Sequence, residues 1–148
     1  MFSNKNSKQK SDALKTILDR KGIISMPGCF DALSAKLIER EGIEVGFMSG
    51  FSVSSTKLGM PDTGLISFAE MLEQVKNISN ATSIPFIFDG DTGYGNSVNV
   101  YRTVRGYADA GAAGVMFLSP QGIGSHQTCG SSPCLELPSV RYFHDDHT

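Results

Sequence analysis

One short stretch, residues 84–96, constrains the fold of this chain more than any other. It reads IPFIFDGDTGYGN: an apolar run, aspartates at positions 89 and 91, and a glycine-rich turn. The apolar run predicts a buried strand and the glycines predict a sharp turn. Because side chains alternate along a strand, Asp89 and Asp91 are expected on the same side, roughly 6–7 Å apart. This pair would suit a hydrated divalent cation such as Mg²⁺, and the alternative is an acidic turn that caps a helix.

The composition narrows the possible partners and locations. With 148 residues, 40% of them hydrophobic, the chain is long enough for one ordinary core. A net charge of -2 argues against a surface for nucleic acid or an anionic membrane. No apolar stretch approaches the roughly 18–20 residues of a membrane span, and no signal-peptide core follows the start, so we expect a cytoplasmic protein. Three cysteines give no disulfide framework, and Cys29 is expected to be a small buried side chain.

Apolar periodicity divides residues 12–118 into alternating helices and strands, behind a lead-in at 1–11 that we expect to be disordered. Such alternation implies parallel strands joined by right-handed crossovers, which is an α/β fold. The expected strands are residues 23–26, 45–48, 84–88 and 115–118. The first expected helix begins at Ser11 or Asp12 and ends at Gly22. The others are residues 32–41, a helix that begins after Ser67, and residues 97–110.

Local signals fix two of the helix starts. Asp31 can cap the helix at 32–41, which would turn Leu33, Leu37 and Ile38 inward. Ser67 and Glu70 have the spacing of a capping box, which predicts a helix behind them. Residues 51–65 are expected to form a long loop, and loops of that length are often functional or mobile.

The polar residues of interest follow the expected strands. Residues 28–31 follow the first strand, Ser49 and Gly50 the second, and Asp89 and Asp91 the third. In parallel α/β folds, ligands bind at the carboxyl ends of the strands. This coincidence favours an active site over a merely structural acidic turn.

Residues 119–148 differ in character, with three histidines, two cysteines and no lysine, and we expect an irregular tail. A zinc site is the alternative, although the ligand spacing matches no standard zinc pattern. Its candidate ligands would be His126, Cys129, Cys134, His144 and His147.

A dinucleotide site is a second alternative for the acidic turn. Gly90, Gly93 and Gly95 follow a strand and precede a helix. Their order differs from the dinucleotide-binding fingerprint, and the neighbouring acids would repel a pyrophosphate, so we do not favour this interpretation.

Taken together, six motifs in residues 12–117 are specific enough to indicate a family. The chain resembles the isocitrate lyase and phosphoenolpyruvate mutase superfamily, and within it most closely the methylisocitrate lyase and oxaloacetate decarboxylase branch. The motifs are PGCFDALSA at 27–35, SG at 49–50, LGMPD at 58–62, DGDTGYGN at 89–96, NVYRTV at 99–104 and AGAAGV at 110–115.

The resemblance implies a (β/α)8 TIM barrel whose first half lies in residues 12–118. It implies a Mg²⁺-dependent lyase that cleaves a C–C bond next to a carboxylate in a small 2-oxo or 2-hydroxy acid. Asp89 and Asp91 would be the metal ligands, and Ser49, Gly50 and Asp89 would bind the substrate. Asp62 would act in catalysis from a closing loop. The family's homo-tetramers imply self-association, and phosphonomutase chemistry on a P–C bond is the alternative activity.

The sequence also departs from this family. Where the family has Glu-Asp-Gln after the fourth strand, the chain has Leu118, Ser119 and Pro120, and no Lys-Lys-Cys-Gly-His segment with the catalytic acid of the lyases follows. A complete barrel needs about 250 residues. We therefore expect a truncated, inactive chain, or a non-catalytic remnant that binds metal or pairs with a full-length relative. Reading the codons of residues 119–127 one nucleotide later permits a segment similar to the lost one, so we hypothesise that the tail at 119–148 is out of frame.

Overall fold

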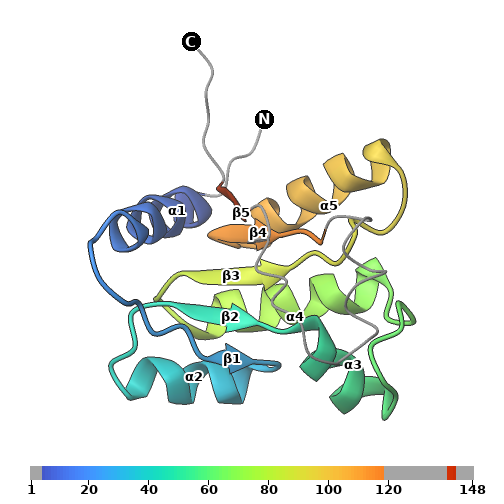
Figure 1. Ribbon diagram of the computed structural model, residues 1–148, viewed down its shortest axis with the longest axis horizontal. Helices are drawn as coiled ribbons and strands as arrows, with labels where there is room; N and C mark the ends of the chain where they lie inside the picture. Colours follow the sequence, from blue (N-terminus) through green and yellow to red (C-terminus); the bar gives the residue numbers. More distant parts are fainter. Residues whose placement is uncertain (1–4, 119–139, 143–148) are drawn as a thin grey trace, which may run out of the picture.

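The computed structural model describes residues 5–118 and 140–142, and within them the strands form one sheet (Figure 1). The strands follow one another across the sheet in the order β1-β2-β3-β4-β5, and the first four are parallel. This confirms the predicted parallel α/β fold. The strands are β1 (Gly28–Cys29), β2 (Gly46–Met48), β3 (Phe86–Asp89), β4 (Gly114–Met116) and β5 (Val140–Tyr142).

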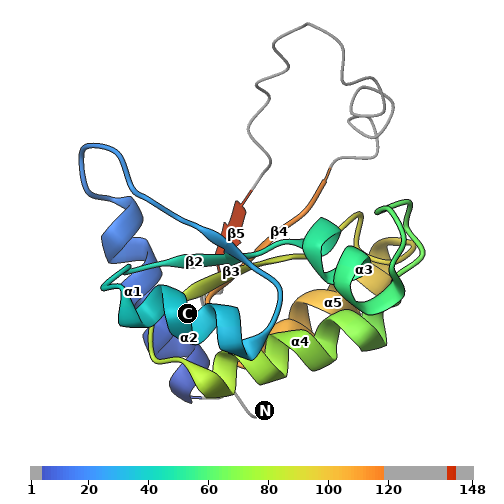
Figure 2. The ribbon, with the colours of Figure 1, turned by 90° about the horizontal axis from the view of Figure 1, so that it is seen from below.

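Helices cover one face of this sheet. Figure 2 shows α2, α4 and α5 side by side beneath the strands, as parallel crossovers of a single hand require. Four side chains that share one register row, Cys29, Met48, Phe88 and Val115, are each at most 1% exposed and pack against these helices. The helices are α1 (Lys5–Leu18), α2 (Ala32–Arg40), α3 (Gly50–Leu58), α4 (Phe68–Ala81) and α5 (Ser97–Asp109).

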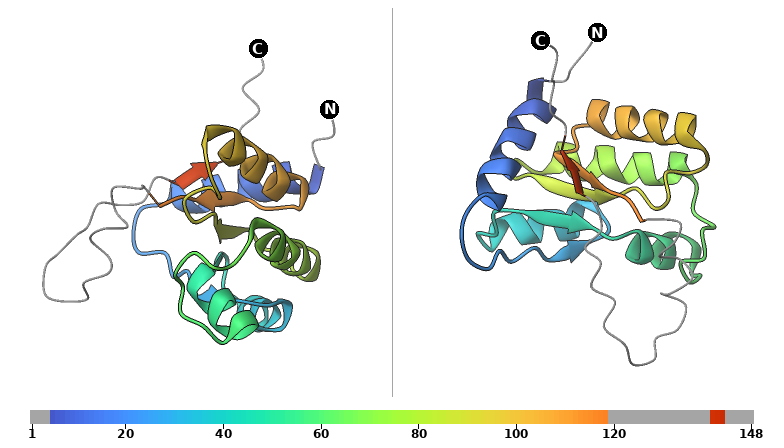
Figure 3. Two further views of the ribbon diagram at one scale, coloured as in Figure 1. Left: turned by 90° about the vertical axis from the view of Figure 1, so that its right-hand side faces the viewer. Right: turned by 45° about the horizontal axis from the view of Figure 1, so that its top comes forward.

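The opposite face carries the alternate residues of each strand. Phe47 and Ile87 are register partners there, and Asp89 shares this face because it lies two residues beyond Ile87. Leu14 of α1 packs into the same cluster as Ile87. In Figure 1 and in the right-hand view of Figure 3, α1 lies at the end where the strands begin, opposite to α3.

The predicted disordered lead-in at residues 1–11 is wrong for residues 5–11, because α1 begins at Lys5. The side chain of Lys10 is 5% exposed and donates to the carbonyls of Ser79 and Thr82, both at 2.8 Å. The Ser7 hydroxyl donates to the carbonyl of Ala112, also at 2.8 Å. These side chains supply hydrogen-bond donors to main-chain carbonyls of other elements. The polar residues that suggested disorder therefore help to hold α1 against the rest of the fold.

The predicted strand at residues 23–26 is wrong, and β1 lies later, at Gly28–Cys29. Ile23 is fully exposed and Met26 is 40% exposed. Pairing starts at Pro27, whose carbonyl accepts from the amide of Phe47 at 3.1 Å. A proline lacks an N–H but keeps its acceptor, so it can open a strand at the sheet edge.

The predicted loop at residues 51–65 is also wrong over most of its length, because α3 occupies Gly50–Leu58. Ser49 is the N-cap of this helix, and its hydroxyl accepts from the amide of Ser52. Gly59 ends the helix with a left-handed φ of 63°. Short polar side chains dominate α3, and the burial of Val53 supplies the packing that overrides their low helix propensity.

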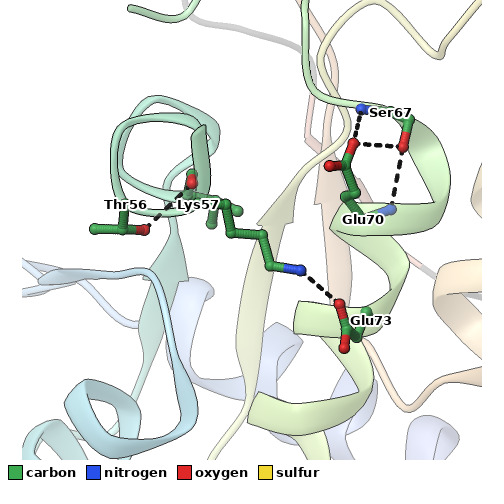
Figure 4. A network of polar contacts seen from close by, with 6 residues as sticks. Thr56, Lys57, Ser67, Glu70 and Glu73 are labelled. Carbon is green, nitrogen blue, oxygen red and sulfur yellow. Dashed lines mark hydrogen bonds and ion pairs between the residues drawn. The ribbon is translucent and has the colours of Figure 1, made fainter. Parts of the chain in front are cut away.

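The two predicted helix starts are confirmed. Asp31 caps α2 in a capping box with Ser34, and Ser67 caps α4 in a capping box with Glu70. Figure 4 shows the second box beside an ion pair of 2.5 Å between Lys57 of α3 and Glu73 of α4. The connection between α3 and α4 is therefore fixed at both ends.

The predicted inward stripe of α2 is wrong at two positions. Leu33 is 67% exposed and Leu37 is 52% exposed, while Ala35 is fully buried and Ile38 packs against the core. Ala35 and Ile38 lie on the side of α2 that packs against the core, whereas Leu33 lines an open hollow beside α4.

The predicted irregular tail is wrong at residues 140–142, where β5 pairs antiparallel with β4. The remaining residues of the tail, including the candidate zinc ligands, lie outside the described residues. Cys29 is 1% exposed, and burial raises the pKa of its thiol to about 12, in agreement with a structural role. Within residues 5–118 and 140–142, no helix has the length and hydropathy that a bilayer crossing requires.

Candidate active site

The carboxylate of Asp89 lies at the carboxyl end of β3 and is held from two sides. Its Oδ2 accepts from the amide of Gly50 at 3.0 Å, and its Oδ1 accepts from the amide of Asp91 at 2.9 Å. Gly50 is the first residue of α3, directly after the turn that follows β2. The two amides fix the orientation of the carboxylate and leave each oxygen with further acceptor capacity.

Asp91 lies in a turn and not in the strand. Its φ is +49°, and β3 ends at Asp89. The alternation of strand side chains, from which we predicted a spacing of roughly 6–7 Å, therefore does not apply to this pair. The carbonyl of Asp91 accepts from the amide of Leu118 at 2.8 Å, and the amide of Gly90 donates to the carbonyl of Met116 at 2.8 Å. Main-chain bonds to the end of β4 thus hold the turn.

The turn needs glycine at two places. Gly93 has a φ of +92°, and a Cβ there would lie 2.4 Å from Cγ2 of Val100. Gly95 has a φ of +141°, a region that other residues rarely enter. Tyr94 between them also has a positive φ, of 62°. The glycine-rich segment is therefore a tight connection to α5, held against its first turn.

Three acidic side chains influence one another at this edge of the sheet. Burial raises the pKa of Asp89, and the negative charges of Asp91 and Asp62 raise it further, although the two amide bonds act in the opposite direction. Burial also raises the pKa of Asp91, followed by the charge of Asp62. The structure thus brings Asp62, which is exposed on the connection from α3 to α4, within electrostatic reach of both acids.

These residues fit a hard divalent cation in their chemistry. Mg²⁺ prefers oxygen ligands, keeps several waters, and commonly uses only one or two protein carboxylates together with a substrate. The described residues contain no group of three or more histidine, cysteine or acidic side chains arranged to hold a metal. Asp89 and Asp91 therefore match a site completed by water and substrate, and a bound cation would offset the mutual repulsion of the acids.

The predicted substrate residues Ser49 and Gly50 lie beside this carboxylate. The Ser49 side chain caps α3, and its amide donates to the carbonyl of Cys29 at 3.0 Å. A Cβ at position 50 would lie 2.8 Å from Oδ2 of Asp89, so the close approach of α3 requires glycine. Their roles toward a substrate remain predictions.

The sequence analysis did not identify three hydroxyl groups that lie next to the turn carrying Asp89 and Asp91. The Tyr107 hydroxyl donates to the carbonyl of Asp89 at 3.1 Å, and the Thr103 hydroxyl donates to the carbonyl of Gly93 at 3.2 Å. The Tyr94 hydroxyl lies 3.4 Å from that of Tyr107. Two hydroxyl residues spaced i, i+4 on the apolar face of a helix could have indicated these contacts, because buried hydroxyls need partners.

Known proteins match most of this chain. Residues 14–125 match the family described as phosphoenolpyruvate phosphomutase. The carboxyvinyl-carboxyphosphonate phosphorylmutase of Arabidopsis thaliana, which is named as chloroplastic, is 44% identical over 71% of this chain and 31% of its own. The 2,3-dimethylmalate lyase of Eubacterium barkeri is 43% identical over 68% of this chain and 35% of its own. The chain thus spans about a third of the length of these curated relatives.

Solved structures give the same result. A phosphonopyruvate hydrolase in complex with oxalate and Mg²⁺ superposes with a TM-score of 0.69 at 36% identity, over 73% of this chain and 38% of that one. An oxaloacetate acetylhydrolase superposes with a TM-score of 0.68 at 32% identity, over 72% of this chain and 38% of that one. A lyase, a mutase and two hydrolases thus resemble this chain in sequence or in fold, and the chain belongs to the phosphoenolpyruvate mutase and isocitrate lyase superfamily.

Proposed function

We propose that the carboxyl edge of β2 and β3 is half of the active site of a Mg²⁺-dependent lyase. The lyase would cleave a C–C bond next to a carboxylate in a small 2-oxo or 2-hydroxy acid. Asp89 would hold the metal more directly and Asp91 largely through water. Ser49 and Gly50 would bind a substrate carboxylate or its 2-oxo oxygen, for which the Gly50 amide would exchange its bond to Asp89 for one to the substrate. Asp62 would act in catalysis from the connection between α3 and α4.

One observation carries this proposal: the Asp89 carboxylate is oriented by two amides although two other acids repel it. The amides of Gly50 and Asp91 hold it at 3.0 and 2.9 Å, while burial and the charges of Asp91 and Asp62 raise its pKa. A structural cap would not require two further carboxylates at its face. A cation at this position would make the same three charges favourable.

The local chemistry agrees with enolate formation. Cleavage next to a carboxylate leaves negative charge on an enolate, and a bound Mg²⁺ would supply the Lewis acid that stabilises this charge. Gly50 and Asp91 orient the carboxylate before any ligand arrives, which lowers the reorganisation needed during the reaction. Asp62 lies on an exposed connection that could close and exclude water from the enolate.

The test is a titration of the full 148-residue chain with Mn²⁺ as a paramagnetic substitute for Mg²⁺, with and without oxalate. We expect saturable binding that oxalate strengthens, and Asp91→Asn should weaken it at least about tenfold. Asparagine is almost isosteric with aspartate and tolerates a φ of +49°, so this variant should fold normally. Asp109→Asn, at the exposed end of α5, is the matched control. Equal affinity in all three proteins would refute the proposed metal site.

Turnover by this chain alone is not expected. These 148 residues do not contain the Lys-Lys-Cys-Gly-His segment, which the resemblance implies for the catalytic acid of the lyases. We therefore expect metal and oxalate binding without cleavage of oxaloacetate, isocitrate or methylisocitrate. Cleavage of any of these acids above the rate with Mg²⁺ alone would contradict this part of the proposal.

Phosphonomutase chemistry is the second candidate, because the 44% identical relative is named a phosphorylmutase. The same carboxylates and amides would serve either substrate class. Competition against oxalate in the Mn²⁺-loaded chain separates the two: oxaloacetate should displace oxalate for the lyase type, and phosphonopyruvate should displace it more strongly for the mutase type. A remnant that pairs with a full-length relative would instead need that relative present for tight oxalate binding.

A further inference from the structure

The acid turn at residues 89–96 is fixed from behind by α5. Thr103 and Tyr107, one helical turn apart on the same face, are 2% and 0% exposed. Each hydroxyl donates to a main-chain carbonyl of the turn, Thr103 to that of Gly93 and Tyr107 to that of Asp89. Both acceptors belong to the segment that carries the two candidate metal ligands.

These bonds add to the main-chain hydrogen bonds of the turn. The carbonyl of Gly90 accepts from the amide of Gly93 at 2.9 Å, and that of Asp91 accepts from the amide of Leu118 at 2.8 Å. The carbonyls of Asp89 and Gly93 are reached by the hydroxyls of α5. Removal of either hydroxyl would leave a carbonyl at the turn without this donor, and such a group is costly where water has little access.

The bond from Tyr107 to Asp89 fixes the direction of a second bond, between the hydroxyls of Tyr94 and Tyr107. Tyr107 has one hydroxyl proton, which it donates to the Asp89 carbonyl, so Tyr94 must donate to the oxygen of Tyr107 across 3.4 Å. Tyr94 belongs to the turn itself, with a φ of +62°. The rings of Tyr94 and Tyr107 both pack on Phe68 of α4, with centroid distances of 5.8 and 6.2 Å. The turn is therefore tied to α5 through side chain and main chain alike.

We propose that Thr103 and Tyr107 are positioning residues, whose hydroxyls hold the main chain of the acid turn so that Asp89 and Asp91 face a divalent cation. The metal part of this inference rests on the proposed function. The positioning part does not rest on it. The amides of Gly50 and Asp91 donate to the Asp89 carboxylate, so their hydrogen-exchange rates depend on its position even without a metal.

Tyr107→Phe and Thr103→Val remove only the hydroxyls and keep the size of the side chains. We expect each to weaken Mn²⁺ binding by roughly tenfold, the lower end of the range for residues that support a metal ligand indirectly. Tyr101→Phe on α5 is the control for the first, since this hydroxyl lies on a side chain that is 65% exposed. Thr56→Val on α3 is the control for the second, because its hydroxyl bonds only within its own helix.

Amide hydrogen exchange of the metal-free full chain is the second measurement. In Tyr107→Phe the amides of Gly50 and Asp91 should exchange roughly two- to tenfold faster, the factor that corresponds to one weakened neutral hydrogen bond. The amide of Glu70, which donates to Ser67 in the capping box of α4, should keep its rate. General destabilisation would accelerate all three amides together, and this outcome would overturn the positioning role.

The two measurements separate the two hypotheses. If the parent chain binds no Mn²⁺ while the amides of Gly50 and Asp91 respond selectively, the metal site fails and the positioning role stands. If Mn²⁺ binding is lost in Asp91→Asn but stays within twofold of the parent in both hydroxyl variants, the metal site stands and the positioning role is refuted.

Discussion

The amide of Gly50 donates to Oδ2 of Asp89 over 3.0 Å, which joins the first residue of α3 to the last residue of β3. The two residues are 39 positions apart in the sequence. Their contact exists because β2 and β3 are parallel neighbours whose carboxyl ends meet at one edge. The bond gives the buried carboxylate a main-chain donor that fixes its orientation.

Gly50→Ala tests this contact directly. A Cβ at position 50 would lie 2.8 Å from Oδ2 of Asp89, so either the carboxylate or α3 must move. We expect the free energy of unfolding to fall by about 1–3 kcal/mol, as for other overpacked sites, and Mn²⁺ affinity to fall with it. Urea unfolding and a Mn²⁺ titration measure the two effects. Gly28→Ala is the control, because a Cβ at this position would have no atom within 4 Å. Equal changes in unfolding free energy and Mn²⁺ affinity in both variants would contradict the prediction.

The raised pKa values of Asp89 and Asp91 predict an unusual pH dependence. Each carboxyl has a folded pKa above its ordinary 3.8, so the folded chain binds these protons more tightly than the unfolded chain. Stability from these two groups therefore decreases as pH rises from 3.8 through the folded pKa values, and stays reduced at neutral pH.

Asp91→Asn tests this effect, because it removes the Asp91 carboxyl and its charge beside Asp89, while acids outside the site titrate alike in both proteins. At neutral pH the variant should be more stable than the parent in the absence of metal, since it removes a repelled charge. Its advantage should shrink as the pH falls toward 3.8, where the parent carboxyls take up protons. Urea unfolding of both proteins across this pH range is the measurement. A difference that grows at low pH would show that the pKa shift has the opposite sign.

The elements predicted correctly from the sequence are those whose signals are local. The helix caps predicted at Asp31 and Ser67 bond to amides three positions ahead, and the apolar run before Asp89 is a continuous strand signal. The carboxyl-edge position of Ser49, Gly50 and Asp89 followed from the alternation of elements alone. Local chemistry thus predicted most of the fold and the main candidate residues.

The features that the sequence did not reveal depend on distant partners. β1 is displaced from the apolar residues 23–26 because its position is set by pairing with β2. Lys10 lies in a polar segment, and only the carbonyls of Ser79 and Thr82 make it a buried residue. The paired residues of β4 and the antiparallel β5 are 24 or more positions apart in the sequence, so no local turn pattern predicts this pairing. The hydroxyl of Tyr107 bonds to Asp89 in another element, so its acceptor could not be predicted from the helix that carries it.

Lys10→Met tests whether α1 is part of the folded unit. The ammonium group donates to the carbonyls of Ser79 and Thr82 at the end of α4, and methionine would bury the same stem without a donor. We expect a loss of about 2–4 kcal/mol in the free energy of unfolding, because two buried carbonyls lose a charged donor. Lys8→Met, an exposed position in the same helix, should change it by less than about 0.5 kcal/mol. Equal losses in both variants, measured by urea unfolding, would mean that the contact is not specific.

The exposed leucines of α2 lead to a prediction about association. In the described part of the chain, β4 pairs with β5 and β1 lies at the end of the sheet. Leu33 and Leu37, four positions apart on the helix beside β1, are 67% and 52% exposed. An open strand edge next to apolar side chains favours contact with other chains.

We therefore expect the chain to self-associate through this edge in a concentration-dependent way, and the double variant Leu33→Lys, Leu37→Lys to shift it toward the monomer. The free energy of unfolding should change by less than about 1 kcal/mol, because both side chains are already largely in water. Sedimentation velocity over a wide concentration range measures the association. Val98→Lys, at a 73% exposed apolar position on α5, is the matched control and should leave the association unchanged. A parent chain that stays monomeric throughout, or a double variant that associates as strongly as the parent, would show that this edge is not the contact surface.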